Sequence, residues 1–409
     1  MDLPRMSDQR RVVDRQDRDH NFDCASGPML NKAAIIRFLL VAAFSILAAT
    51  VLQEHLGSST IYSPAHRTER MLLHEAILAN SPPKGLTWRE IGAGGTNIRI
   101  LTVYLADGLH RLTNADVNTI YKNIDTASMI VFLTMAFYYF EQMSGTVYAL
   151  AGVLYMVFSF VTTYSFYYFH PWDRLSLVVW LLLLIAIKKK QFPAVAGLLV
   201  IGMLIKFDVI LVPALYLAYC FNRNSAVKSV GRTLMLFTVT IGVYWALDKH
   251  FHAASAADAS QSTYQLLLHG LKKNLRVFSA MWLTYPPLTV FGLSLSFSAY
   301  YLIFLREYDR FATVSAIFGI MMFGPYLAVN FHETRALMPI LLLLMPSVLL
   351  GLRKLTAGSL ATTAVSRLPV VQQRSMDAHG TSAGLLAREV SGQHPSGTPW
   401  SVRVRDKHR

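Results

Sequence analysis

Charged residues are scarce in this sequence. Of its 409 residues, 15% are Asp, Glu, Lys or Arg, against about 25% in typical soluble domains, while 53% are hydrophobic. The apolar residues stand in uninterrupted runs, such as LSLVVWLLLLIAI (175–187) and ALMPILLLLMPSVLLGL (336–352). Such runs are typical of segments that lie in lipid. The composition therefore argues against a water-soluble domain with one core and favours a helical membrane protein.

Cysteine and the familiar catalytic motifs are also lacking. Of the two cysteines, Cys24 lies in the polar N-terminal segment and Cys220 at the end of an apolar run, so the sequence offers no disulfide framework or thiolate metal site. The sequence contains no Walker loop, HExxH, CxxC or dinucleotide fingerprint. Without a nucleotide-binding motif, we do not expect ATP-driven transport by this chain alone.

Positive charge is in excess, with 38 Lys and Arg against 24 Asp and Glu and a formal net charge of +14. The bases do not form the continuous patch that nucleic-acid binding requires, so we expect no nucleic-acid partner. They stand in short clusters between the apolar runs, which is the pattern that sets membrane orientation. The clusters are Lys188, Lys189 and Lys190; Arg223, Lys228 and Arg232; Arg306 and Arg310; and Arg353 with Lys354.

The sequence predicts an all-α, polytopic helical membrane protein with about ten transmembrane helices. Residues 1–32 and the basic segment 355–409 are predicted to be disordered cytoplasmic tails, and 33–354 to be the transmembrane domain. The ten apolar runs are 35–52, 128–140, 146–168, 174–187, 192–205, 207–221, 233–247, 279–305, 311–331 and 336–352. The first run could also be a signal peptide begun at Met29, but no convincing cleavage site follows it. Several runs are shorter than the roughly 20 residues that span a bilayer, so some would be completed by flanking aromatics or pair as buried hairpins.

The stretch 53–126 is predicted to be a long extracytoplasmic first loop that contains an amphipathic surface helix. Five apolar residues fall on one helical face, and Arg99, Asp107 and Arg111 lie off it. The apolar five are Ile98, Leu101, Leu105, Leu109 and Leu112. A helix packed on the rest of the loop fits the same pattern.

The basic residues Lys32 and Arg37 place the start of the first run in the cytoplasm, so both termini are predicted to be cytoplasmic. All four basic clusters then fall inside. The outer loop 248–278 fits this topology least well, because it holds four basic residues. A rival topology merges 192–221 into one helix, but it would place Arg223, Lys228, Arg232, Arg353 and Lys354 outside.

Under this topology, unusual polar residues gather at the outer ends of the helices. They occur at Glu54 and His55, in HPWDR (170–174), in KFD (206–208) and in HETR (332–335). Ionisable residues near membrane depth are costly unless they are paired or face a wet cavity, and they mark functional sites by default. The alternative for each loop is an ordinary solvated charge.

Each residue type suits a chemical role. Arg174, Lys206 and Arg335 can hold a phosphate, with Asp208 and Glu333 orienting those bases. Glu54, Asp173 or Glu333 can take a proton from a hydroxyl or ligate a divalent metal, the one candidate cofactor. His170 and His332 can act as acid or base, and Trp172 can stack on a sugar or anchor the helix at the interface.

The arrangement of motifs resembles bacterial polytopic envelope proteins of the GT-C glycosyltransferase type. The motifs are RILTVYLA (99–106), PWD (171–173), IKFDVILVP (205–213) and ETRALMP (333–339), within residues 34–354. The resemblance implies a polyprenyl-phosphate sugar donor and an acid near the end of the first span, where Glu54 stands, as base or metal ligand.

The leading hypothesis is therefore a GT-C-like glycosyltransferase of the bacterial inner membrane. It would move a sugar from a polyprenyl-phosphate donor to an envelope acceptor on the extracytoplasmic face. The alternatives are an envelope polysaccharide polymerase and, from another class, a secondary transporter or lipid flippase. Internal repeats would favour transport, and the sequence shows none.

Overall fold

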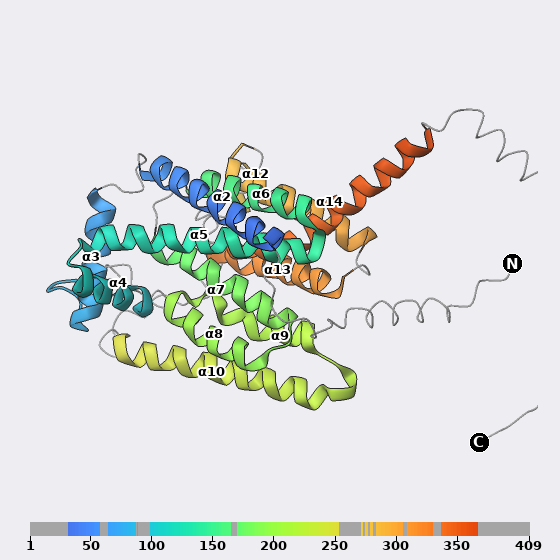
Figure 1. Cartoon of the computed structure of the whole chain (residues 1–409). Helices are drawn as coiled ribbons and strands as arrows, with labels where there is room; N and C mark the ends of the chain where they lie inside the picture. The colour runs from blue at the N-terminus through green and yellow to red at the C-terminus, as the bar shows by residue number, and fades with distance from the viewer. Residues whose placement is uncertain are drawn as a thin grey trace, which may run out of the picture. The chain divides into compact units, whose positions relative to one another are not determined.

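The computed structural model describes residues 32–57, 64–86, 88, 99–164, 170–252, 271–272, 275–276, 279–280, 284–305, 309–329 and 337–366. Every regular element in these ranges is a helix, as Figure 1 shows. The prediction of an all-helical chain is confirmed to this extent. The predicted tail 1–32 lies outside the described residues except for Lys32, which begins the first helix.

The helices are α2 (Lys32–Gly57), α3 (Pro64–Ala79), α4 (Ile100–Thr113), α5 (Val117–Ser144), α6 (Thr146–Tyr164), α7 (Pro171–Lys188), α8 (Phe192–Ile205), α9 (Val212–Cys220), α10 (Ala226–His252), α12 (Pro286–Phe304), α13 (Arg310–Val329) and α14 (Met338–Ser366), with the short 3-10 helices η2 (Phe207–Leu211) and η3 (Arg223–Ser225). The chain divides into two compact units, Met1–Gly351 and Leu352–Arg409. In the second unit the structure describes the last part of α14.

Five of the described helices are long and apolar enough to cross a membrane, and they belong to α2, α6, α10, α12 and α14. Three shorter apolar segments accompany them: Phe192–Ile205, Phe207–Cys220 and Arg310–Gly324. These helices are compatible with a bilayer. The predicted number of ten spans, and the position of α4 on a membrane surface, stay predictions.

Several boundaries differ from the apolar runs because polar residues can begin or extend a helix. Helix α5 begins at Val117, eleven residues before the predicted run at 128, since the Asp116 side chain accepts a hydrogen bond from the Thr119 amide at 3.2 Å. Helix α12 begins at Pro286, a residue favoured in the first helical turn, whereas the run begins at 279. Helix α14 continues to Ser366, so the first part of the predicted tail 355–409 is helical.

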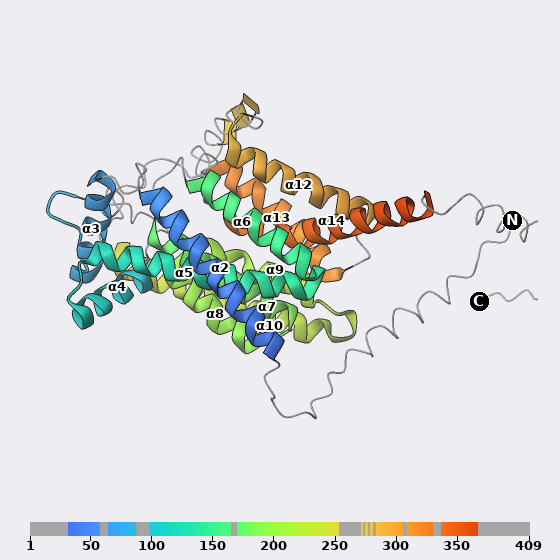
Figure 2. The ribbon, with the colours of Figure 1, turned by 45° about the horizontal axis from the view of Figure 1, so that its top comes forward.

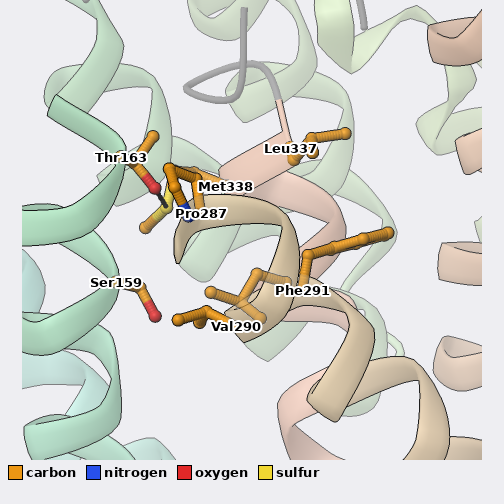
Figure 3. Close-up of a pocket in the computed structure, with 8 residues that line it drawn as sticks. Ser159, Thr163, Pro287, Val290, Phe291, Leu337 and Met338 are labelled. Carbon is orange, nitrogen blue, oxygen red and sulfur yellow. Dashed lines mark hydrogen bonds between the residues drawn. The ribbon is translucent and has the colours of Figure 1, made fainter. Parts of the chain in front are cut away.

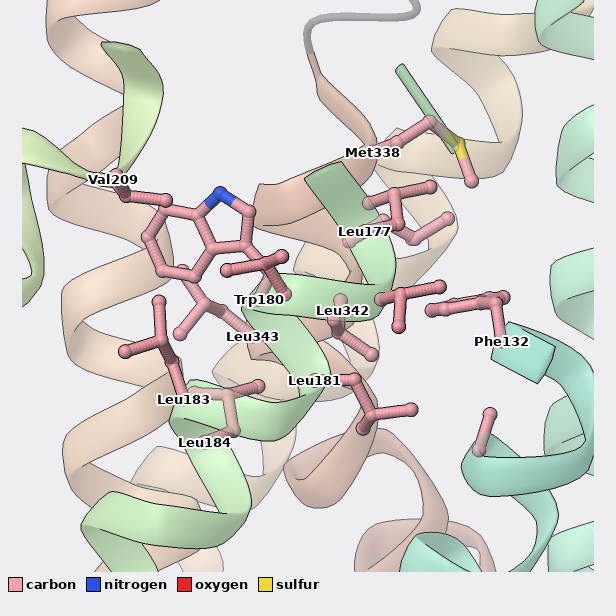
Figure 4. Packing of buried hydrophobic residues seen from close by; sticks show 14 of the residues in the cluster. Phe132, Leu177, Trp180, Leu181, Leu183, Leu184, Val209, Met338, Leu342 and Leu343 are labelled. Atoms are coloured by element: carbon pink, nitrogen blue, oxygen red, sulfur yellow. The ribbon is translucent and has the colours of Figure 1, made fainter. Parts of the chain in front are cut away.

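Helices α5 and α7 are central in the packing of the first unit. Helix α5 contacts α2, α4, α6 and α7, while α7 also contacts α8 and α9, and α10 packs against α8 and α9. Figures 1 and 2 show α2 and α6 alongside α5, with α10 beyond α8 and α9. Around Trp180, which is fully buried, the leucines of α7 meet those of α14 (Figure 4).

Small residues allow close packing where helices cross. A Cβ atom on Gly152 of α6 would lie 2.9 Å from the Phe140 ring of α5 and 3.0 Å from Leu349 of α14. Only the absence of a side chain lets these three helices meet.

The first unit has two chemically different ends, which the contacts between helices define. At one end, Asp125 of α5 meets Arg174 in the first turn of α7, and Lys206 follows the last residue of α8. We call this the network end. At the other, which we call the basic end, Lys188 of α7 lies near Phe311 of α13, and Arg232 of α10 lies over Phe192 of α8. The rise of α7 separates Arg174 from Lys188 by roughly 20 Å.

Candidate functional site

A fully buried ion pair joins α5 to α7 at the network end. The Arg174 guanidinium donates a hydrogen bond from Nη1 to Oδ2 of Asp125, and neither side chain is exposed to solvent. Arg174 reaches this position because His170 and Pro171 begin α7 three residues earlier. Since a buried ion carries a desolvation cost of several kcal/mol, each of the two depends on the other.

Lys206 joins two further carboxylates. Its backbone is extended and ends α8, and its Nζ lies 3.0 Å from Oδ1 of Asp173 and 3.5 Å from Oδ2 of Asp208. Asp208 also accepts hydrogen bonds from Trp180 Nε1 at 3.1 Å and from Ser176 Oγ at 3.4 Å. One face of α7 therefore supplies the acid Asp173 and the two donors that hold Asp208.

An aromatic and cationic stack lies beside these groups. The Arg99 guanidinium carbon lies 4.2 Å from the centre of the Trp172 ring, and the His170 ring stacks on Trp172 with 4.7 Å between ring centres. Arg99 is buried immediately before α4, and its charge acts on Lys206. Trp172 is buried as well, so it is part of the protein interior.

The ionised groups of this region form one balanced set, which we call the charge network. Its members come from four segments that are distant in sequence, and their three negative charges equal their three positive charges. The members are Asp125, Asp173 and Asp208, with Arg99, Arg174 and Lys206. The side chain of Lys206 is 16% exposed to solvent, against 0% for Arg174 and 3% for Asp173. Lys206 is thus the best placed of these three to meet a ligand.

A small apolar hollow lies among α6, α12 and α14 (Figure 3). Its lining residues are Ser159, Thr163, Pro287, Val290, Phe291, Leu337, Met338 and Leu341. Thr163 Oγ1 donates to the Met338 sulfur at 3.9 Å across it. The hollow is at the network end, because it is lined by the end of α6 and by the starts of α12 and α14.

The structure brings together part of the site that the sequence predicts. Asp173, Lys206 and Asp208 form one contact group, and His170 and Trp172 form a second beside it. Arg174 lies deeper and is held by Asp125. The predicted site residues His332, Glu333 and Arg335 lie outside the described residues.

Glu54 is separate from this group. It is exposed in the last turn of α2, and within the described part of the chain it makes no ion pair or side-chain hydrogen bond. Its proposed role as base or metal ligand therefore draws no support from contacts with the charge network.

Sequence reasoning missed Asp125 and gave Arg99 no role at the site. Asp125 lies within the predicted loop 53–126, three residues before the apolar stretch SMIVFL, and an acid so close to an apolar run is itself a signal of a buried partner. Arg99 was treated as a solvent-facing residue of a surface helix, whereas it is buried over Trp172.

No group of three or more His, Cys, Asp or Glu side chains that could hold a metal ion occurs in the described ranges. The carboxylates of the charge network are neutralised by Arg and Lys.

No protein-family model, curated protein or solved structure matches this chain. The resemblance to GT-C glycosyltransferases therefore depends on the sequence motifs alone.

Proposed function

We propose that this chain is a GT-C-like membrane glycosyltransferase that moves a sugar from a polyprenyl-phosphate donor to an envelope acceptor. The observation that carries the proposal is the contact between the part-exposed Lys206 ammonium and the Asp173 carboxylate, at one end of a set of apolar helices. A cation for the departing phosphate and a carboxylate for the incoming hydroxyl are the two groups that this transfer needs most.

The chemistry follows from these two groups. The acceptor hydroxyl attacks the anomeric carbon of the donor sugar, and its proton passes to the Asp173 carboxylate. The bond between the anomeric carbon and the phosphate oxygen breaks, and the polyprenyl phosphate leaves with the electron pair. Lys206 stabilises the charge on that phosphate as a point charge. In this proposal Arg174 positions Asp125 and α7 and does not touch the donor.

The proposed location is the bacterial inner membrane, with both termini cytoplasmic and the network end on the extracytoplasmic face. The support is the charge distribution: Lys188, Lys189, Lys190 and Arg232 belong to the basic end, where positive charge marks the cytoplasmic side. A phosphatase reporter fused after residue 354 is expected to be inactive in a periplasmic assay. An active fusion would place the network end in the cytoplasm.

Transfer is tested with purified protein in proteoliposomes that contain polyprenyl-phosphate sugars and an envelope acceptor fraction. The parent is expected to transfer sugar, and Asp173→Asn is expected to lose nearly all turnover while most of the protein stays folded, because Asp208 still neutralises Lys206. Glu141→Gln, which removes an acid from the opposite end of α5, is the matched control and should transfer normally. Normal transfer by Asp173→Asn would reject Asp173 as the base.

A secondary transporter is the second candidate, and the observation that favours it is the fully buried Asp125–Arg174 pair. Paired charges inside a membrane domain also occur along ion and substrate pathways. If the parent transfers no sugar from any polyprenyl-phosphate donor and instead exchanges a solute across vesicles, transport replaces transfer as the function.

A further inference from the structure

The start of α4 is an unusual place for buried polar groups. Thr102 lies three residues after Arg99, which puts both on the same face of the helix, and both are buried. Thr102 Oγ1 makes no hydrogen bond with any described residue. A buried hydroxyl without a partner costs stability, so a buried hydroxyl at this position is a candidate to bind a ligand.

Trp172, over whose ring the Arg99 guanidinium lies, carries a second buried donor. The Trp172 indole is 2% exposed, and its Nε1 hydrogen has no acceptor among the described residues. Buried indole N–H groups usually find a partner, as Trp180 does with Asp208 at 3.1 Å. The same helix thus carries one satisfied and one unsatisfied indole, and the unsatisfied one lies under the Arg99 guanidinium.

The backbone of α4 adds further donors at this point. The first amide groups of any α-helix have no acceptor within the helix, and the Arg99 side chain does not cap those of α4. The positive end of the helix dipole lies there as well. Helix α4 packs against α8, whose last residue immediately precedes Lys206. Two cations, two unsatisfied side-chain donors and a helix N-terminus therefore gather at one place.

We propose that Arg99, Thr102, Trp172 and Lys206 form a binding site for the oxyanion of a phosphate ester, which for the proposed function is the phosphate of the polyprenyl donor. Every group in the set donates hydrogen bonds or carries positive charge, which suits phosphate oxygens. The proposal deepens the proposed function and rests on it for the identity of the ester.

Binding of this anion has a consequence for Asp173. The Lys206 ammonium lies 3.0 Å from Oδ1 of Asp173. A phosphate that draws the ammonium toward itself weakens the ion pair with Asp173 and leaves that carboxylate available to the acceptor hydroxyl. The donor would in this way prepare the base that its own transfer requires.

The test is a binding measurement on the full-length protein in nanodiscs, by calorimetric titration with decaprenyl phosphate and, separately, with inorganic phosphate. Arg99→Gln is expected to raise the Kd for decaprenyl phosphate at least about tenfold, because a charged hydrogen bond is lost. Thr102→Val keeps the shape of the side chain and should raise the Kd for decaprenyl phosphate about threefold or more. Arg111→Gln is the control, since Arg111 is on the same helix, exposed and paired with Asp107; it should stay within about twofold of the parent.

The results separate this site from the proposed function. If Arg99→Gln does not fold, as judged by elution and melting temperature, Thr102→Val carries the test. Unchanged affinity in every folded variant at Arg99 and Thr102 overturns the site, even if the parent transfers sugar. Arg99-dependent binding in a protein that transfers no sugar keeps the site and overturns the function. Binding of inorganic phosphate as tight as that of decaprenyl phosphate assigns the site to a soluble phosphate ester.

Discussion

Helix α5 carries an ion pair near each of its ends, and the two pairs differ in their surroundings. Near its start, Asp125 meets Arg174 of α7 with both side chains fully enclosed. Near its end, Glu141 meets Arg37 of α2 at 2.8 Å, with 17% and 50% of the side chains exposed. Both pairs join a carboxylate of α5 to an arginine of another helix. They differ in their position along α5 and in their exposure to solvent.

The difference in exposure indicates a different role for charged residues at each end of the molecule. An exposed pair is screened by water and contributes little to stability, so the bases at the basic end are free to serve orientation. An enclosed pair cannot lose one partner without leaving an ion in an apolar interior. Charge at the network end is therefore a constraint on the fold, and a sequence keeps such a constraint for packing specificity or for chemistry.

The largest expected effect comes from breaking the enclosed pair. Arg174→Met should lower the free energy of unfolding by about 3–5 kcal/mol, because Asp125 is left as an uncompensated buried charge. The double variant Arg174→Met with Asp125→Leu should recover most of that loss, because no ion remains. Unfolding in detergent, titrated with SDS, measures both. A double variant as unstable as the single one would show that the pair contributes chiefly through packing.

A smaller loss is expected at Lys206, which is part-exposed. Lys206→Met should cost about 1–3 kcal/mol, because Asp173 loses the ammonium that lies 3.0 Å away. Adding Asp173→Asn should restore part of the stability in the same SDS titration. Because Asp208 keeps its bonds from Trp180 and Ser176, adding Asp208→Asn should restore less. Equal, mild effects in all three variants would mean that these charges are hydrated.

The exposed pair provides the contrast. Arg37→Gln should change the free energy of unfolding by about 0.2–1 kcal/mol, the range of solvent-exposed ion pairs. High salt should reduce the difference between this variant and the parent, while leaving the Arg174→Met effect largely intact. A loss of the same size as that of Arg174→Met would remove the distinction between the two ends.

The smallest expected effect is local and depends on pH. His74 of α3 shares a 2.8 Å hydrogen bond with the Tyr121 hydroxyl, and burial lowers the pKa of His74 from its ordinary 6.5, although Asp107 and Glu75 oppose that shift. Because the unfolded form takes up the proton first, stability is complete above about pH 6.5 and falls as the pH drops toward the folded pKa. Hydrogen exchange in α3 should therefore be faster at pH 5.5 than at pH 7.5.

A His74→Gln variant should remove most of this pH dependence, whereas His250→Gln, a control on α10, should keep it. Exchange in α3 that is equally fast at both pH values in the parent would show that protonation of His74 does not loosen this contact. Neither variant should alter stability at the network end.

Much of the fold was predictable because apolar runs need lipid or protein around them, whatever their exact boundaries. The runs at 192–205 and 207–221 correspond closely to α8 and to η2 with α9. Helix α5 shows the limit of this reasoning: its first turns are polar, and its start depends on the cap at Asp116. Hydropathy alone cannot find such a helix start.

The candidate site was predictable in part. HPWDR and KFD stood out because charged residues interrupt apolar sequence, and the structure brings Asp173 and Lys206 within 3.0 Å. The partner of Arg174 was not predictable, because Asp125 is 49 residues away and a sequence does not show which distant helices meet. Arg99 was missed for a similar reason, since the face that a helix buries depends on its neighbours.

The most direct measurement is a density map of the protein in nanodiscs with decaprenyl phosphate. The expected result is phosphate density within hydrogen-bond distance of Lys206 and Arg99, at the network end. Phosphate density at the basic end, beside Lys189 and Lys190, with none at Lys206, would contradict the assignment of the network end as the site of chemistry.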